Sequence, residues 1–226
     1  EYFLQICDII DLTQDLHHMT RGSAGSSLVC YLLGITDVDP IKWQIPVARF
    51  MNPMRDDLPD VDIDFQHHKQ GEVMNRIFSK WPGKTARLSN YVMYKEKSAR
   101  REAAKRLGAE GNLPRNFTYE SVGVDPVEAR RIESKLMGKK RAISKHCGGI
   151  VMFTRKLPKS LISEDNQILL DKHEVEDLEH LKVDILANRG LSQLLEIEPD
   201  RPLTEYPERD EKTAALLSRG DVLGVT

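Results

Sequence analysis

The chain has 226 residues, of which 40% are hydrophobic and 30% charged, enough for one large domain or two small ones. No apolar run approaches the roughly 18–20 residues that a membrane span needs, so we expect no membrane partner. The net charge of −2 by itself argues neither for nor against nucleic acid. The three cysteines are odd in number and lack CxxC spacing, which predicts free thiols in a reducing compartment rather than a zinc site.

Charge is unevenly distributed along the chain. Residues 80–106 hold nine Lys or Arg against two acids, and residues 128–159 hold ten against two. After residue 163 the acidic residues dominate. A basic middle between soluble flanks is typical of a surface that lies on a polyanion, although solvated helix faces would give the same composition.

The predicted elements mix helices and strands without a regular βαβ rhythm. Residues 2–18 have apolar positions at helical spacing, and a Gly- and Ser-rich turn at 21–27 leads into a helix that stops at Gly34. The later expectations are helices at 71–81, 91–107, 126–137 and through most of 188–226, and strands at 60–65, 148–153, 167–170 and 181–186. This pattern favours an α+β fold over a doubly wound one.

The strand at 60–65 carries three aspartates on one face. Asp60, Asp62 and Asp64 alternate with apolar residues, and side chains two apart on a strand share a face roughly 6.5–7 Å apart. Like charges held so close repel one another, and a hard cation with oxygen ligands is the usual remedy. An exposed edge strand whose acids discourage aggregation is the alternative, but the apolar residues between them indicate a packed face.

Two further features complete a possible phosphate-transfer site. Asp184 is the one charge within residues 183–186, and a buried charge is unfavourable unless it is paired or bound to metal. Gly22-Ser23 precede a helix, where glycine lets the backbone approach a phosphate. Taken singly, Asp184 could be an ordinary strand-end residue and Gly22-Ser23 a plain tight turn. Together with the aspartate strand they suit two-metal phosphoryl transfer.

Six segments, in order along the chain, resemble motifs of the C-family bacterial DNA polymerases, the DNA polymerase III α subunits. The segments are RGSAGSSLVCYLLGITDVDP at 21–40, RFMNP at 49–53, PDVDIDF at 59–65, HCGGIV at 146–151, LKVDIL at 181–186 and RGDVLGV at 219–225. Asp171-Lys172 and the "KVDIL" sequence resemble the error-prone branch. Ala187-Asn188-Arg189-Gly190 departs from the family's usual "LGL", and His67-His68 after the aspartate strand are unusual and are interpreted as surface residues.

The resemblance implies an α+β fold built on a polymerase β-like nucleotidyltransferase palm, a mixed sheet with helices, into which a helical thumb is inserted. The palm would comprise residues 1–89 and 141–187, the thumb residues 90–140, and a truncated start of the fingers residues 188–226. The family's phosphoesterase-like domain and clamp-binding region would lie outside the chain, which we expect to be a fragment or a truncated relative.

The resemblance also assigns roles to individual residues. Two Mg²⁺ ions would be bound by the catalytic Asp62, Asp64 and Asp184, with Asp60 in a supporting place. The nucleotide-binding residues would be Gly22, Ser23, Arg49 and Lys182, since Arg binds phosphate bidentately and Lys as a point charge. The DNA-binding residues would be Lys95, Lys97, Arg100, Arg101, Lys105, Lys145 and His146. For His146, a buried structural histidine remains an alternative.

The implied function is that of a DNA-directed DNA polymerase core, which transfers a nucleotide from a dNTP to a primer 3′-OH and releases pyrophosphate. Its partners would be primer–template DNA and dNTPs, with other replisome subunits bound through regions outside this chain, in the cytoplasm of a bacterial or phage-infected cell. One alternative is a catalytically inactive palm and thumb module that only binds DNA. A template-independent nucleotidyltransferase on the same palm is a second.

Overall fold

The computed structural model describes residues 2–50, 61–171, 174–175, 181–207 and 209–220. Asp60, Lys172 and Asp221–Val225 therefore lie outside the described residues. The described chain divides into two compact units, one of residues 1–88 and 146–226 and the other of residues 89–145.

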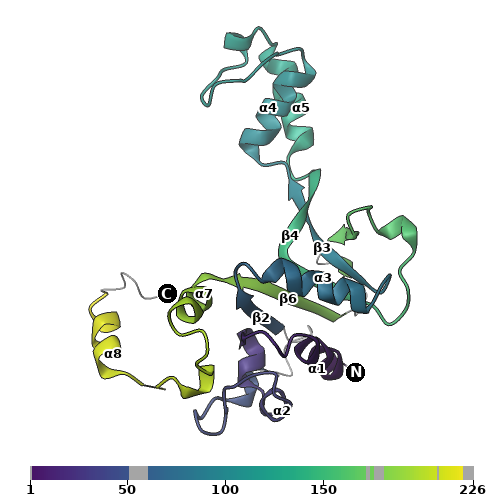
Figure 1. Cartoon of the computed structure of the whole chain (residues 1–226). Helices are drawn as coiled ribbons and strands as arrows, with labels where there is room; N and C mark the ends of the chain where they lie inside the picture. The colour runs from purple at the N-terminus through teal and green to yellow at the C-terminus, as the bar shows by residue number, and fades with distance from the viewer. Residues whose placement is uncertain (1, 51–60, 172–173, 176–180, 208, 221–226) are drawn as a thin grey trace. The chain divides into compact units, whose positions relative to one another are not determined.

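The chain is an α+β protein, as predicted (Figure 1). Its described strands are β1 (His18–Arg21), β2 (Val61–Gln66), β3 (Thr85–Met93), β4 (Lys140–Met152), β5 (Gln167–Asp171) and β6 (Leu181–Asn188). Its described α-helices are α1 (Tyr2–Leu12), α2 (Leu28–Leu32), α3 (Gln70–Lys80), α4 (Glu96–Arg106), α5 (Pro126–Leu136), α7 (Arg189–Ile197) and α8 (Glu211–Ser218). Short 3₁₀ turns are η1 (Gly22–Ser26), η2 (Val47–Arg49), η3 (Glu120–Val122), η4 (Lys159–Leu161) and η5 (Leu203–Glu205). Among these helices, none combines the length and apolar character needed to cross a lipid bilayer.

The strands form one mixed sheet in the order β1-β2-β6-β4-β3-β5. The pair β2 and β6 is parallel, whereas β1 pairs with β2 and β4 pairs with β6 in the antiparallel sense. A parallel pair requires a long connection between its strands, and here more than a hundred residues separate β2 from β6. Residues distant in sequence thereby become direct neighbours.

One face of the sheet is packed and the other carries the carboxylates. Val61, Ile63 and Phe65 of β2 are at most 1% exposed and share a core with apolar residues of β6, α1 and α3. Asp62 and Asp64 alternate with them, so these two side chains point to the opposite face. The sequence therefore correctly predicted that one face of this strand is packed.

Two helices are shorter than predicted, and some of the residues expected in them belong to strands of the sheet instead. The first helix ends at Leu12 instead of continuing to residue 18, and Thr13 Oγ1 donates to Ile9 O at 2.9 Å just beyond its end. His18–Arg21 then pair with β2 as a short strand. Likewise, residues up to Met93 belong to β3, so the helix expected from residue 91 begins only at Glu96.

Residues 89–145 form the second unit, in which α4 and α5 pack together. Asp125 accepts hydrogen bonds from the first backbone N–H groups of α5, and Pro126 stands at its first position. A small separate core lies beside these helices and contains Ala104, Leu113, Phe117, Tyr119, Val124 and Ala129 among others. The boundaries of the unit fall inside β3 and β4.

Candidate active site

One row of residues crosses four strands of the sheet at the carboxylate face. Arg21 of β1 is paired with Asp62 of β2, Asp62 with Asp184 of β6, and Asp184 with Gly149 of β4. Directly paired residues point to the same face, and adjacent strands lie roughly 4.8 Å apart. The register thus brings Asp62 and Asp184 side by side although they lie 122 positions apart. The two strands that carry them, β2 and β6, lie next to each other in Figure 1.

Asp64 is the most deeply buried of the three predicted metal ligands, with its residue only 1% exposed. Its Oδ2 accepts from Arg21 Nε at 2.7 Å and from Asn188 Nδ2 at 2.7 Å. Its Oδ1 has no hydrogen-bond partner among the described residues. Both donors therefore bind the same oxygen, Oδ2. A buried carboxylate oxygen without a hydrogen bond, as Oδ1 is within the described structure, is costly in a folded protein.

The two carboxylate oxygens of Asp184 also have different surroundings. Lys182 Nζ lies 3.7 Å from its Oδ2 and His146 Nδ1 lies 3.5 Å from its Oδ1. Both distances are too long for good hydrogen bonds, and Oδ1 is buried without a hydrogen-bond partner in the described structure. The three side chains are largely buried, with 15–18% of each exposed.

The His146 ring is fixed by the backbone of the glycine pair that follows it. Nδ1 accepts from Gly149 N at 2.7 Å and lies 3.3 Å from Gly148 N, so in the neutral ring the proton belongs on Nε2. Arg87 donates to the carbonyls of His146 and Cys147. The ring therefore lies against Asp184, and its predicted contact with DNA stays a prediction.

Both glycines of this segment are required by close packing. A Cβ at Gly148 would lie 2.4 Å from Ile185 O, and one at Gly149 would lie 2.8 Å from His146 Nδ1. Because no real Cβ tolerates such contacts, glycine permits β4 to approach β6 and His146 to approach Asp184.

The chemistry of these residues fits a divalent metal ion. Asp64 Oδ1 and Asp184 Oδ1, which lack a hydrogen-bond partner in the described part of the chain, belong to neighbouring parallel strands. Mg²⁺ prefers carboxylate oxygen ligands and binds through as few as one or two carboxylates. Among the described residues, however, no three His, Cys, Asp or Glu side chains converge closely enough to hold a metal. Arg21, Asn188 and Lys182 instead compensate the carboxylates.

The predicted phosphate cradle follows directly from β1. Arg21 ends the strand, and Gly22 starts η1 with φ +77°, a conformation that favours glycine. Ser27 then caps the short α2, accepting from Cys30 N at 3.2 Å. Gly22 and Ser23 therefore begin one residue beyond the row that contains Asp62 and Asp184.

Arg49 lies at the end of η2, which contacts η1, and its side chain is exposed. The next residue, Phe50, is buried, and its ring packs against Phe3 with centroids 6.1 Å apart. This buried neighbour holds Arg49 near the cradle while leaving its guanidinium in solvent. Lys182 shares its face with Asp184, as alternation along β6 requires.

The basic residues predicted to bind DNA fall into two groups in the unit of residues 89–145. Lys95, Lys97, Lys105 and Lys145 are exposed. Arg100 and Arg101 are half-buried and support the loop after α4. Arg100 stacks over the rings of Phe117 and Tyr119 at 5.0 and 5.6 Å, and Arg101 donates to Leu113 O at 2.8 Å.

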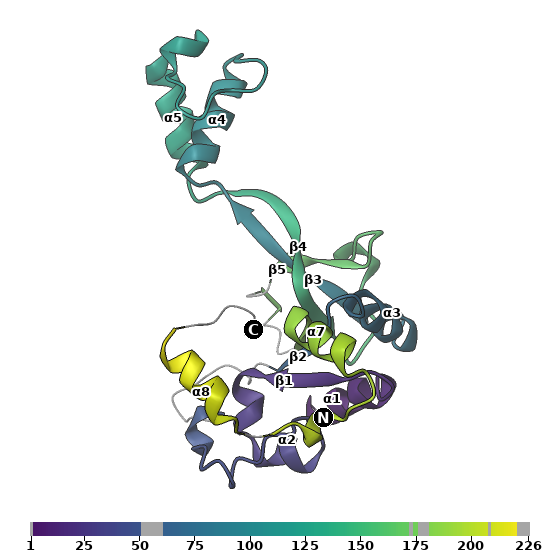
Figure 2. The same ribbon diagram turned by 60° about the vertical axis from the view of Figure 1, so that its left-hand side comes forward.

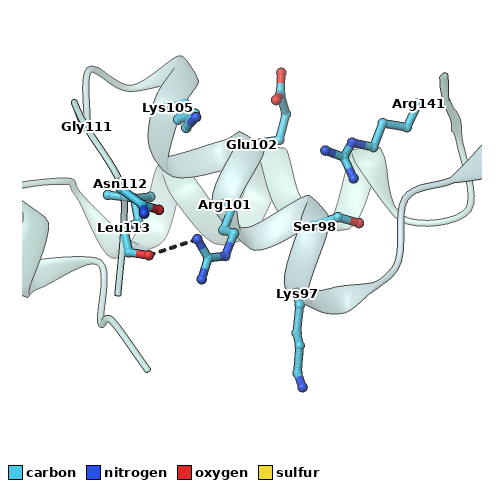
Figure 3. Close-up of a pocket in the computed structure, with 9 residues that line it drawn as sticks. All are labelled: Lys97, Ser98, Arg101, Glu102, Lys105, Gly111, Asn112, Leu113 and Arg141. Carbon is cyan, nitrogen blue, oxygen red and sulfur yellow. Dashed lines mark hydrogen bonds between the residues drawn. The ribbon is translucent and has the colours of Figure 1, made fainter. Parts of the chain in front are cut away.

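A shallow pocket of about 390 Å³ lies between α4 and this loop (Figure 3). Its lining includes the four cationic residues Lys97, Arg101, Lys105 and Arg141 with a single acid, Glu102. Glu102 pairs with Arg106 at 3.0 Å. The pocket is therefore positively charged, as a surface that lies on phosphates would be.

Two residues of the site were not assigned a role from the sequence. Arg21 was noted only as the start of the glycine-rich segment, and Asn188 only as a departure from a family motif. Both contact Asp64 through side chains that come from other strands. A single sequence contains no signal for either contact, because the contacts depend on the register of β2 with β1 and β6.

Comparison with known proteins identifies the family. The family model of the bacterial DNA polymerase III alpha NTPase domain matches residues 1–123. An error-prone DNA polymerase 2 from Rhizobium meliloti (strain 1021) is 31% identical over 259 residues, covering 99% of this chain and 24% of its own length. Error-prone DNA polymerases from Saccharophagus degradans and Dechloromonas aromatica are 30% and 32% identical, each over 99% of this chain and 26% and 25% of their own lengths.

The chain thus spans about a quarter of the length of these curated relatives. Their names agree with the resemblance to the error-prone branch. The family match covers the cradle, Asp62 and Asp64, while the matches to the relatives extend over the segment that contains Asp184. The chain belongs to the family of the bacterial DNA polymerase III alpha NTPase domain.

Proposed function

We propose that this chain contains the catalytic face of a DNA polymerase palm, which adds nucleotides from dNTPs to a primer 3′-OH with two Mg²⁺ ions. The observation that carries the proposal is the register of β2 and β6, which pairs Asp62 with Asp184. In addition, one buried oxygen each of Asp64 and Asp184 has no hydrogen-bond partner among the described residues. Family membership supports the same activity, since the named relatives are DNA polymerases.

In this proposal Asp62, Asp64 and Asp184 hold the metal ions. When bound, two such ions activate the attacking hydroxyl and neutralise the charge on the leaving pyrophosphate. The chain's own contribution is positioning and charge, because phosphoryl transfer needs little covalent help. Gly22 and Ser23 would hold the triphosphate through the backbone, with Arg49 and Lys182 supplying positive charge.

The domain assignment is part of the proposal. Residues 1–89 and 141–187 would form the palm and residues 90–140 an inserted thumb, with residues 188–226 as the start of the fingers. Its support is the separate unit of residues 89–145, whose own core would let it fold as an inserted element. Exposed Lys95, Lys97 and Lys105 would contact the duplex backbone, which positions DNA without reading its sequence.

Primer extension tests the proposal. The chain, or the longest protein that contains it, is supplied with primer–template DNA, dNTPs and Mg²⁺, and product length is measured. We expect metal-dependent extension that Asp62→Ala and Asp184→Ala both abolish. Asp200→Ala, which removes an exposed carboxylate, should leave extension unchanged. Extension that survives either of the first two substitutions would refute the assignment of the site.

A non-catalytic DNA-binding module is the second candidate. It is favoured by one observation: among the described residues, no three side chains form a metal-binding group. The carboxylates of Asp64 and Asp184 are instead paired with Arg21, Asn188 and Lys182. Such a module would bind duplex DNA with a steep dependence on salt and no requirement for Mg²⁺. A titration of DNA binding with and without Mg²⁺ and dNTP distinguishes it from the polymerase.

A further inference from the structure

Asn188 connects the carboxylate of Asp64 to the start of α7. Its Nδ2 donates to Asp64 Oδ2 at 2.7 Å, and its Oδ1 accepts from Leu191 N at 2.9 Å as the N-cap of the helix. The cap fixes the orientation of the amide, because only the oxygen can accept from Leu191 N. The NH₂ group is thereby directed toward Asp64.

The backbone of Asn188 is fixed as well. It is paired with Gln66 at the end of β2, and its carbonyl accepts from Ser192 Oγ at 3.0 Å. Ser192 is 1% exposed, and the same hydroxyl accepts from His67 N at 2.8 Å. The turn after β2 and the first turn of α7 are therefore tied together through one buried serine, and α7 contacts β2 (Figure 2).

This arrangement determines which oxygen of Asp64 is available. Asn188 and Arg21 both bind Oδ2, so the carboxylate cannot rotate without breaking two hydrogen bonds, one of them charge-assisted. Oδ1 is left buried and without a partner among the described residues. Of these two donors Arg21 is 54% exposed at its side chain, whereas the Asn188 amide is held at both ends.

We propose that Asn188 is a positioning residue, which holds Asp64 Oδ2 so that Oδ1 is presented to a divalent metal ion. The proposal rests on the proposed function, in which Asp64 is a metal ligand. The side chain must combine a helix-capping acceptor with a donor to a carboxylate, and asparagine supplies both. Serine or threonine would cap α7 but would not donate to Asp64 across the same distance.

The test separates capping from orientation of Asp64. Asn188→Ser and Asn188→Thr keep a capping hydroxyl and remove the amide donor, while Asn188→Ala removes both. Asp210→Ser is the matched control, because Asp210 caps α8 by accepting from Lys212 N and Thr213 N of that helix. The chain is titrated with Mn²⁺, free Mn²⁺ is measured by electron paramagnetic resonance, and thermal unfolding is recorded for each variant.

We expect about tenfold weaker Mn²⁺ binding in all three Asn188 variants, the size typical for the loss of a group that orients a metal ligand. Only Asn188→Ala should also lower the unfolding temperature clearly, and Asp210→Ser should bind Mn²⁺ as the unchanged chain does. A purely structural role predicts instead that the loss of Mn²⁺ affinity follows the loss of thermal stability, and that result overturns the proposal.

Asp64→Asn distinguishes failure of this inference from failure of the proposed function. If Asp64→Asn loses Mn²⁺ binding while Asn188→Ser and Asn188→Thr bind within twofold of the unchanged chain, orientation by Asn188 is refuted and the metal site stands. If Asp64→Asn binds Mn²⁺ unchanged, Asp64 is no metal ligand, and the proposed function and the role of Asn188 are both refuted.

Discussion

At Gly148, strand β4 approaches strand β6 so closely that there is no room for a larger residue. In Gly148→Ala the new Cβ would lie 2.4 Å from Ile185 O, 2.7 Å from Leu186 Cδ2 and 3.1 Å from Ile185 C. Leu186 can move its side chain, but the Ile185 carbonyl belongs to the backbone of β6, next to Asp184. Relief of the clash must therefore displace the strand that carries a proposed metal ligand.

The size of the effect follows from the contacts. Carbon–oxygen contacts are comfortable at roughly 3.3–3.6 Å, so β4 and β6 must separate by about 1 Å at this point. Overpacking of this kind costs about 1–3 kcal/mol. Ile185 O also accepts from Gln70 Nε2 at 2.7 Å, and loss of that hydrogen bond adds about 1 kcal/mol. We expect Gly148→Ala to lower the free energy of unfolding by about 2–4 kcal/mol.

Urea unfolding followed by circular dichroism measures this change, and Gly71→Ala is the matched control. Gly71 lies in α3, its φ is not positive, and a Cβ added there would meet nothing within 4 Å, so alanine should be neutral or stabilise by up to about 1 kcal/mol. A Gly148→Ala chain whose stability lies within about 0.5 kcal/mol of the unchanged chain, the range usual for surface substitutions, would refute the proposed strand contact.

Further predictions concern the second unit, the acid dependence of stability and the thiols. Arg100→Ala should destabilise residues 89–145 by about 1–2 kcal/mol, because the guanidinium stacks on two aromatic rings. Lys97→Ala should change the stability of this unit by less than about 0.5 kcal/mol. Hydrogen exchange of the amides within the unit measures both changes. Burial lowers the pKa of His18 below its ordinary value, so as the pH falls the unfolded state takes up a proton before the folded state does. Stability should therefore be lost as the pH falls below about 6.5, the ordinary value for histidine, and His18→Leu should reduce that loss in unfolding measurements. Exposed Cys147 should react at once with a thiol reagent, whereas Cys30, whose pKa is raised by burial, should react only on unfolding; equal rates would contradict the described burial.

Local sequence patterns were sufficient to predict the elements in which apolar and polar residues alternate regularly. The aspartate strand was predicted because Val61, Ile63 and Phe65 must face a core when the residues between them are charged, and the structure buries all three. The helix expected at 126–137 is observed at 126–136, where Asp125 caps its N-terminus and Pro126 stands at its first position.

Elements that depend on pairing were missed or shortened. The four-residue β1 (His18–Arg21) contains a single apolar residue, Met19, so its sequence shows no apolar alternation, and its residues pair with β2. The strand expected at 148–153 extends over Lys140–Met152, and its first six residues are exposed, so apolar periodicity gave no indication of them. In both cases hydrogen bonding to a neighbouring strand outweighs local preference.

In the candidate site, too, local sequence predicted some features, whereas others depend on strand pairing. Asp62, Asp64 and Asp184 were chosen because charge in an apolar strand is costly, and the structure places them on one face of adjacent strands. The contacts of Arg21 and Asn188 with Asp64 could not be predicted, because they depend on the pairing of three strands that are distant in sequence.

We propose that the carboxylates of β2 and β6 together bind a divalent metal ion. Fe²⁺ can take the place of Mg²⁺ at such oxygen sites, and in the presence of ascorbate and peroxide it generates radicals that cut the backbone nearby. Mapping the fragments by mass spectrometry should give cuts near residues 61–66 and, in the same sample, near residues 181–188, both suppressed by excess Mg²⁺ and by Asp184→Ala. Cleavage at neither segment, or cleavage that Asp184→Ala leaves unchanged, would contradict the claim.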